Sequence, residues 1–233
     1  MAAFGLTYDW YDADIEPWQK AFVEYRRFTG SGPIIARINI GHRFDITDYQ
    51  GEIDFWPVIS ENWYGYMNVG ISGGDLFPEF RGGAELYRAL PKGFEASLGF
   101  RYLKFTQDDV LIFTGSVSKY LGRWLLIGRP YFTPQDSGVS TSLTFNARRY
   151  FANPDSFFSL IGGYGFSPDE RRLIDGQLDN RFLKSRFLGL IGNYLLKDTI
   201  ELFGEVKATD QEFTFSADFI RIYTFEFGAR YRF

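Results

Sequence analysis

The stretch TFEFGARYRF, at positions 224–233, alternates strictly between apolar and polar side chains. Aromatic or small apolar residues occupy Phe225, Phe227, Ala229, Tyr231 and Phe233, and small or charged residues stand between them. Successive side chains of a β-strand point to opposite faces of the sheet. This period of two therefore predicts a strand with one apolar and one polar face.

The same alternation recurs along the whole chain, and helical spacing is nowhere sustained. It is clearest at 79–88, 93–105, 138–151 and 199–208. We predict the other strands at 3–11, 18–29, 33–44, 51–59, 62–73, 110–121, 123–133, 156–166, 182–195 and 219–233. The pattern predicts fourteen strands, with twelve as the alternative count.

The predicted connections differ between the two ends of the strands. Tight turns at 30–32, 60–61, 89–92, 121–123, 152–155 and 195–198 all fall at one end. Longer segments at 12–17, 45–50, 74–78, 106–109, 134–137, 167–181 and 209–218 fall at the other. An even number of antiparallel strands with short turns on one side is the layout of an outer-membrane barrel. We found no repeat or linker, so residues 1–233 are expected to form one domain.

A soluble β-sandwich is the alternative that this alternation leaves open. The polar faces, however, mix acids with arginine, and strands of about ten residues or more suit a tilted membrane crossing. Aromatic residues also gather near strand ends, as in the girdles at bilayer interfaces. These aromatics are Trp10, Tyr11, Trp18, Trp56, Trp63, Tyr64, Tyr66, Tyr120, Trp124, Tyr150 and Phe151. The sequence thus favours an all-β fold, a transmembrane antiparallel up-and-down β-barrel.

Hydrocarbon imposes closure on such a barrel, because an unpaired backbone group facing lipid costs several kcal/mol. We therefore expect 219–233 to pair with 3–11, with Phe233 on the lipid face. A terminal aromatic after alternating apolar residues also resembles the signal that the barrel assembly machinery reads. The first residues, MAAFGLTYDW, lack a signal-peptide pattern, so for an exported chain we expect that such a peptide has been removed.

Composition narrows the functional classes. The chain has no cysteine, which excludes disulfides, thiolate metal sites and a catalytic thiol. Its net charge of −4, spread along the sequence, gives no basic footprint for nucleic acid. No run approaches the roughly 20 apolar residues of a membrane helix. We expect no cofactor, and as partners outer-membrane lipid and lipopolysaccharide, the assembly machinery, and a glycan or small polar solute.

The stretch ALPKGFEASLGFRYLKFTQDDVLIFTGSVSKYLGRWLLIGRPYF, at 89–132, resembles the YaiO-like outer-membrane β-barrel family. FPEFRGGAELY at 77–87 and the final Phe233 fit the same family. The resemblance implies an outer-membrane barrel of a Gram-negative bacterium, but no established activity. An association with exopolysaccharide production or export is implied only by analogy.

The polar faces of the strands provide the candidate site, a charge-lined lumen for a solute or glycan. By parity we expect the following side chains to face inward: Arg37, Arg43, Glu52, Asp54, Glu79, Arg81, Glu85, Glu95, Arg101, Arg129, Arg148, Glu201, Glu205, Lys207, Glu226, Arg230 and Arg232. The competing interpretation is that these charges pair across strands and merely fill the interior.

Other candidate residues carry weaker signals. His42, the only histidine, shares parity with the lipid-facing Ile38 and Ile40, so an interfacial position is favoured over catalysis. Glu52 and Asp54 are expected to meet lumen arginine, and Asp108 and Asp109 to lie in a solvated loop. The longest loop, 167–181, is compatible with a lid, a constriction or a plain surface excursion. GGYG at 162–165 has no following Lys-Ser or Lys-Thr, so a phosphate loop is not supported.

The sequence therefore predicts an outer-membrane barrel with a polar lumen that is not an enzyme. The expected role is a channel or export component for a hydrophilic solute, with an exopolysaccharide as one candidate. Two alternatives remain open: a membrane-embedded lipid-modifying enzyme, and a structural partner barrel within an envelope complex.

Overall fold

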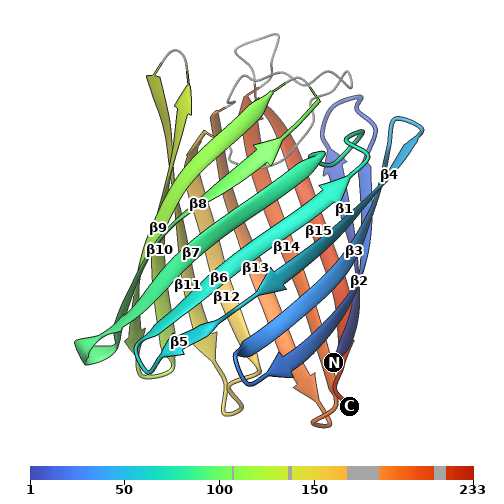
Figure 1. The fold of residues 1–233 in the computed structure, drawn as a ribbon. Coiled ribbons are helices and arrows are strands. Elements are labelled where there is room, and N and C mark those ends of the chain that lie inside the picture. Colours follow the sequence, from blue (N-terminus) through green and yellow to red (C-terminus); the bar gives the residue numbers. More distant parts are fainter. Residues whose placement is uncertain (107, 136–137, 167–183, 213–218) are drawn as a thin grey trace.

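The computed structural model describes residues 1–106, 108–135, 138–166, 184–212 and 219–233. These residues form one antiparallel sheet that curves into a barrel (Figure 1). Its strands are β1 (Ala2–Tyr11), β2 (Trp18–Thr29), β3 (Gly32–Arg43), β4 (Ile46–Phe55), β5 (Val58–Ser60), β6 (Trp63–Ser72), β7 (Phe80–Leu90), β8 (Phe94–Lys104), β9 (Asp109–Leu121), β10 (Trp124–Gln135), β11 (Gly138–Tyr150), β12 (Phe157–Phe166), β13 (Lys184–Leu196), β14 (Ile200–Glu212) and β15 (Phe219–Tyr231).

Two pairings close the barrel. Strand β1 pairs with β15 from Ala2↔Tyr231 to Tyr11↔Ile222, so the first and last strands are neighbours as predicted. Strand β4 pairs with both β3 and β6, and β5 continues β4 along β6. The described strands therefore make fourteen crossings of a closed barrel, which confirms the higher of the two predicted counts. No helix in the described part of the chain is long and apolar enough to span a membrane.

Proline explains why one crossing is split into β4 and β5. Pro57 has no N–H to give to the ladder, so regular pairing stops at Phe55 and resumes at Val58. The backbone remains attached nearby, because the Val58 N–H donates to the Ser31 carbonyl at 2.8 Å and the Pro57 carbonyl accepts from Gly65 at 2.8 Å.

Both termini lie at one end of the barrel, called here the terminal end; the opposite end is the loop end (Figure 1). The turns 30–31, 61–62, 91–93, 122–123 and 197–199 are at the terminal end. The prediction of a loop at 45–50 is wrong, because β4 already begins at Ile46. Phe44 and Asp45 have φ of 54° and 55°, as in the two-residue turns that match the twist of a hairpin. The prediction of a loop at 209–218 is wrong for 209–212, because β14 continues to Glu212, and 213–218 lie outside the described residues.

Burial in this fold is inverted relative to a soluble protein. Asp9 and Ser159 on the inner face are fully buried, and Glu24 is 3% exposed, whereas Leu98 on the outer face is 78% exposed. Phe233 is 76% exposed and stacks on Tyr25 with ring centroids 6.3 Å apart, so it lies on the outer face as expected. An apolar outer face is what a lipid environment requires.

The predicted aromatic girdle is wrong for about half of its members. Tyr11 and Trp18 are only 5% and 4% exposed. The Trp56 ring lies 4.6 Å from that of Tyr66, whose hydroxyl donates to the inward Asp54 at 2.9 Å. Tyr64 stacks on Tyr87 at 4.6 Å, also inside. Nearness to a strand end fixes the height of a side chain in the wall, while parity decides the face, and here parity selects the interior.

Glycine at the closing seam allows a test of this packing. A β-carbon on Gly228 would lie 2.4 Å from the Phe4 carbonyl oxygen and 2.2 Å from the Phe203 ring, so Gly228→Ala must displace backbone. Overpacking of this kind costs about 1–3 kcal/mol of unfolding free energy. We expect that loss in urea titrations of the refolded barrel followed by circular dichroism. Gly192→Ala, where no atom lies within 4 Å, is the control and should leave the midpoint unchanged. Equal midpoints for both variants would contradict the packing described.

Candidate functional site

A cavity of about 1240 Å³ occupies the interior along strands β14, β15 and β1 to β4. It reaches from Pro154 and Asp155 at the terminal end to Phe77 on the loop side. Its basic lining residues are Lys20, Arg26, Arg37, Arg81, Arg148, Lys207, Arg230 and Arg232, and its acidic ones are Glu24, Glu52, Asp155, Glu201, Glu205 and Glu226. The lining is therefore densely charged, with basic groups in slight excess.

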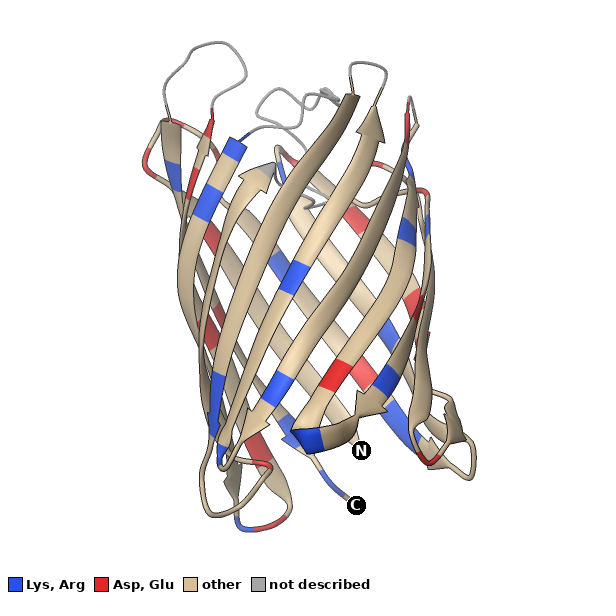
Figure 2. Ribbon diagram, turned by 90° about the vertical axis from the view of Figure 1, so that its left-hand side faces the viewer, with Lys and Arg blue, Asp and Glu red and all other residues tan. Residues whose placement is uncertain are grey.

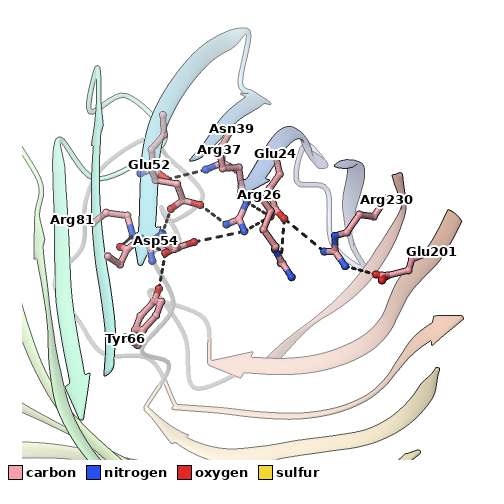
Figure 3. A network of polar contacts seen from close by, with 12 residues as sticks. Glu24, Arg26, Arg37, Asn39, Glu52, Asp54, Tyr66, Arg81, Glu201 and Arg230 are labelled. Carbon is pink, nitrogen blue, oxygen red and sulfur yellow. Dashed lines mark hydrogen bonds and ion pairs between the residues drawn. The ribbon is translucent and has the colours of Figure 1, made fainter. Parts of the chain in front are cut away.

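An ion-pair network on this wall is centred on Arg37 and Glu24 (Figure 3). The Arg37 Nη2 and Nε atoms lie 2.7 Å and 3.2 Å from Glu24 Oε2. Arg37 also donates to Glu52 and lies 3.8 Å from Asp54. The sheet register brings these groups together, because Glu24 faces Arg37 on β3, and Arg37 faces Glu52 on β4. Opposite charges directly across a ladder stabilise it.

The network continues in both directions around the barrel. Toward the seam, Arg230 lies 3.8 Å from Glu24 and donates to Glu201 at 2.6 Å, and Arg232 also contacts Glu201. Toward β7, Arg81 lies 3.5 Å from Glu52. Charges from β14, β15, β2, β3, β4 and β7 are thus linked into one belt, most of which is drawn in Figure 3.

Two phenylalanine rings form an apolar floor beneath this belt. The rings of Phe22 and Phe203 stack with centroids 6.0 Å apart and an interplanar angle of 18°. Each ring covers a glycine, because a β-carbon on Gly5 would lie 2.3 Å from Phe22, and one on Gly228 would lie 2.2 Å from Phe203. The guanidinium groups of Arg37 and Arg230 lie 5.5 Å from the centroids of Phe22 and Phe203 respectively, within cation–π range.

The opposite wall carries a separate, more tightly packed cluster. Arg129 Nη1 donates to both Glu85 oxygens at 2.8 Å and lies 3.3 Å from the Thr114 hydroxyl. Ser97 also donates to Glu85. Glu85 is 7% exposed, and the cluster lies outside the cavity lining. The charges of this cluster therefore pair with one another, as the competing interpretation of the sequence expected.

The sequence-predicted site residues therefore fall into distinct places. The cavity brings together Arg37, Glu52, Arg81, Arg148, Glu205, Glu226 and Arg230, with Asp54 attached through Arg37. Glu85 and Arg129 form the packed cluster. Glu95 accepts a hydrogen bond from the Tyr64 hydroxyl. Arg101 lies 5.6 Å from the Tyr131 ring, and the partly exposed Glu79 lies 3.6 Å from Lys104. That any of them binds a solute stays a prediction.

Two charged groups of the cavity have no oppositely charged group within 4 Å in the described part of the chain. Arg148 donates from Nε to the Ser159 hydroxyl at 3.1 Å, and its guanidinium lies 4.0 Å from the Phe157 ring. Glu226 accepts from the Thr7 hydroxyl at 3.2 Å and stands directly opposite Glu205 on β14. The charges of these two groups are therefore available to a solute in the cavity.

The connection between β6 and β7 folds into the barrel and borders the cavity on the loop side. Leu76 is 2% exposed and Phe77 8% exposed, and both pack against Trp18. Asp48 holds them there, because its Oδ2 accepts the backbone N–H groups of Leu76 at 2.9 Å and Phe77 at 3.1 Å. The Ser72 hydroxyl donates to the Pro78 carbonyl at 2.6 Å. We call residues 73–79 the inward loop.

Sequence reasoning missed the inward loop, together with Glu24, Asp48, Phe22 and Phe203. A signal was present for the first of these, since GGDLFPE places Leu76, Phe77 and Pro78 inside a segment that was predicted only as a connection. Glu24 has the inward parity of its strand and could have been selected on that ground. Asp48 was read as part of a loop, which hid its inward parity.

The structure also gives the contacts of the residues that carried weaker signals in the sequence. His42 Nδ1 lies 2.9 Å from the Thr47 hydroxyl, and Asp109 accepts from the Tyr102 hydroxyl at 2.7 Å. Glu52 and Asp54 meet Arg37, as expected. No group of three or more histidine or carboxylate side chains among the described residues is placed to hold a metal ion. The 167–181 segment lies outside the described residues.

The fold is shared with solved membrane proteins of very different sequence. A bacterial polysaccharide outer membrane secretin superposes with a TM-score of 0.59 at 8% identity, over 100% of this chain and 98% of that one. The Acinetobacter baumannii outer membrane protein Omp33 gives 0.58 at 10% identity, over 100% and 97%. A KdgM porin in complex with disordered oligogalacturonate gives 0.51 at 10%, over 99% of each chain. Identities this low show the fold alone.

The sequence itself gives a more specific match. No curated protein matches it. The family model described as the YaiO membrane beta barrel domain, however, matches residues 2–170, well over half of the chain. This range contains the stretches whose resemblance was noted from the residues, and it runs from β1 through β12. The chain belongs to the family of the YaiO membrane β-barrel domain.

Proposed function

We propose that this barrel is an outer-membrane channel for hydrophilic solutes. The observation that carries the proposal is the cavity of about 1240 Å³, which is lined by charged side chains and enclosed by the wall of a membrane barrel. Outer-membrane barrels place their short turns on the periplasmic side. In that orientation the terminal end faces the periplasm of a Gram-negative bacterium, and the inward loop stands toward the cell exterior.

The lining suits a saccharide better than a small ion alone. Charged groups that are held by partners, such as Arg37 and Glu24, leave further donor and acceptor positions for hydroxyl groups. The stacked rings of Phe22 and Phe203 add an apolar surface on which the C–H face of a sugar ring can rest. Two proteins of the same fold carry glycans in their descriptions, the polysaccharide secretin and the oligogalacturonate-bound porin. An exported or imported oligosaccharide is therefore the preferred solute class.

A structural partner barrel is the second candidate, and specific observations favour it. The Glu85–Arg129 cluster pairs its inward charges with one another, and the inward loop occupies part of the interior. A barrel of this kind would present its outer surface and loops to other envelope proteins, and it would not conduct. A membrane-embedded lipid-modifying enzyme has less support, because the hydrogen-bond partner of His42 is Thr47.

Charge selectivity tests the channel directly. Purified protein inserted into planar bilayers should give discrete conductance steps. Arg148→Gln should shift the reversal potential under a salt gradient toward cation preference, because a cationic group that lacks a carboxylate partner leaves the cavity. Glu226→Gln should shift it toward anion preference for the converse reason.

The neighbouring residue provides the control for this experiment. Arg149 follows Arg148 on β11 but points to the outer face, where it lies 5.5 Å from the Trp124 ring. Arg149→Gln makes the same change in charge and should leave the reversal potential unchanged. Bilayers that stay silent with folded protein would reject the channel and leave the structural partner barrel.

The inward loop yields a second prediction. Asp48→Ala removes the acceptor that holds the backbone N–H groups of Leu76 and Phe77, so the inward loop should leave the interior. We expect a higher single-channel conductance, measured in planar bilayers at high salt, because the loop-side border of the cavity is lost. Asp75→Ala removes one carboxylate from the exposed part of the same loop and should have no effect. If both variants conducted like the unaltered protein, the inward loop would not be the constriction.

A further inference from the structure

Three aromatic–cation pairs lie side by side on the outer face of the barrel near its terminal end. Each pair consists of the first residue of a strand that runs from the terminal end to the loop end, and of its direct partner on the next strand. Arg88 lies 5.0 Å from the Trp63 ring, Lys119 3.8 Å from the Phe94 ring, and Arg149 5.5 Å from the Trp124 ring. We call Trp63, Arg88, Phe94, Lys119, Trp124 and Arg149 the aromatic–cation row.

The height of this row matches the border of the apolar outer surface. Just beyond it, toward the middle of the wall, Leu86 is 44% exposed, Val117 59% and Leu98 78%. On the other side of the row the chain turns back at 91–93 and 122–123. Indole rings and long basic side chains at such a border lie at the level of lipid headgroups.

The three cations have charge available. Within the described residues, no carboxylate lies within 4 Å of Arg88, Lys119 or Arg149, although Lys119 donates to the Lys92 carbonyl. Glu95 follows Phe94 on β8, but it points inside the barrel, where it accepts a hydrogen bond from the Tyr64 hydroxyl. Figure 2 shows this side of the barrel, where several basic segments lie toward the terminal end.

A surface pocket adjoins the first pair. It has a volume of about 580 Å³ and is lined by Trp63 and Arg88 together with Ser60, Asn62, Leu90 and Pro91. A guanidinium group, a hydroxyl and an amide beside an aromatic ring are suited to a phosphate group with a polar head attached.

The row covers one side of the barrel. On strands β13 to β15 the outward residues near the terminal end are apolar or aromatic, as shown by Tyr194 at 57% exposed, Leu196 at 40% and Tyr231 at 54%. Aromatic rings alone fix the height of a wall in the bilayer, whereas the added cations give the β6–β11 side a charge preference that strands β13 to β15 lack.

We propose that the aromatic–cation row binds the phosphate groups of anionic phospholipids in the leaflet on the terminal side of the membrane. The proposal depends on the membrane location of the barrel and not on conduction through it. Each cation near an anionic surface is worth roughly a fivefold gain in lipid association. The barrel then carries a layer of ordered anionic lipid along the β6–β11 side.

The test compares spin-labelled phosphatidylglycerol with spin-labelled phosphatidylcholine at the protein surface in reconstituted bilayers, by electron paramagnetic resonance. The unaltered protein should prefer phosphatidylglycerol several-fold at low salt. The triple variant Arg88→Gln, Lys119→Gln, Arg149→Gln should lose most of that preference, and Arg88→Lys with Arg149→Lys should retain it.

A matched control comes from the outer face at the loop end. Lys184, Arg186 and Arg221 lie there, and Asp210 binds the two arginines at 3.1 Å and 2.6 Å. Replacing these three cations by glutamine makes the same change in net charge and should leave the preference largely intact. The proposal is overturned if the unaltered protein shows no preference, or if both triple variants lose it equally. The single-channel conductance of each variant separates failure of this proposal from failure of the channel.

Discussion

The absence of water in hydrocarbon is the constraint on which this structure depends, because it leaves no partner for an unpaired backbone group at a sheet edge. The barrel meets that constraint by pairing Ala2–Tyr11 with the strand that ends at Tyr231, along the whole length of β1. Closure in turn fixes which face is inside. Once the wall is continuous, outward positions at the level of the hydrocarbon must be apolar, and polar side chains can be placed only in the interior or near the two ends of the barrel.

The charged side chains that face the interior consequently need partners of opposite charge there. Glu24 is 3% exposed and would be costly without partners, yet three arginines lie within 4 Å of it. The partners come from adjacent strands because the register sets them opposite one another. A network of this kind holds each side chain in one position, so the cavity has a defined shape and a fixed pattern of charge.

Parity in the sequence was sufficient to predict the strands and the face to which most charged residues point. It could not predict which charges meet in the cavity, since that depends on register and on how far around the wall each strand lies. Arg129 and Arg148 both have the inward parity of their strands, but Arg129 is packed against Glu85, whereas Arg148 lines the cavity. Trp18 was misplaced for a related reason. An aromatic residue near a strand end fits a girdle, and only the fold shows that the inward loop provides it with an interior contact.

The closing seam also explains where the cavity lies. Closure brings Gly5 of β1 opposite Gly228 of β15, so the wall is thin on its inner side at this point. The freed space is taken by the flat rings of Phe22 and Phe203 from the two flanking strands, and the guanidinium groups of Arg37 and Arg230 lie over those rings. Larger residues at the two glycines would lift the rings and push the arginines away from their carboxylates. The two glycines that face each other at the closing seam therefore make room for the rings that form the floor of the cavity, so closure and site are consequences of a single packing arrangement.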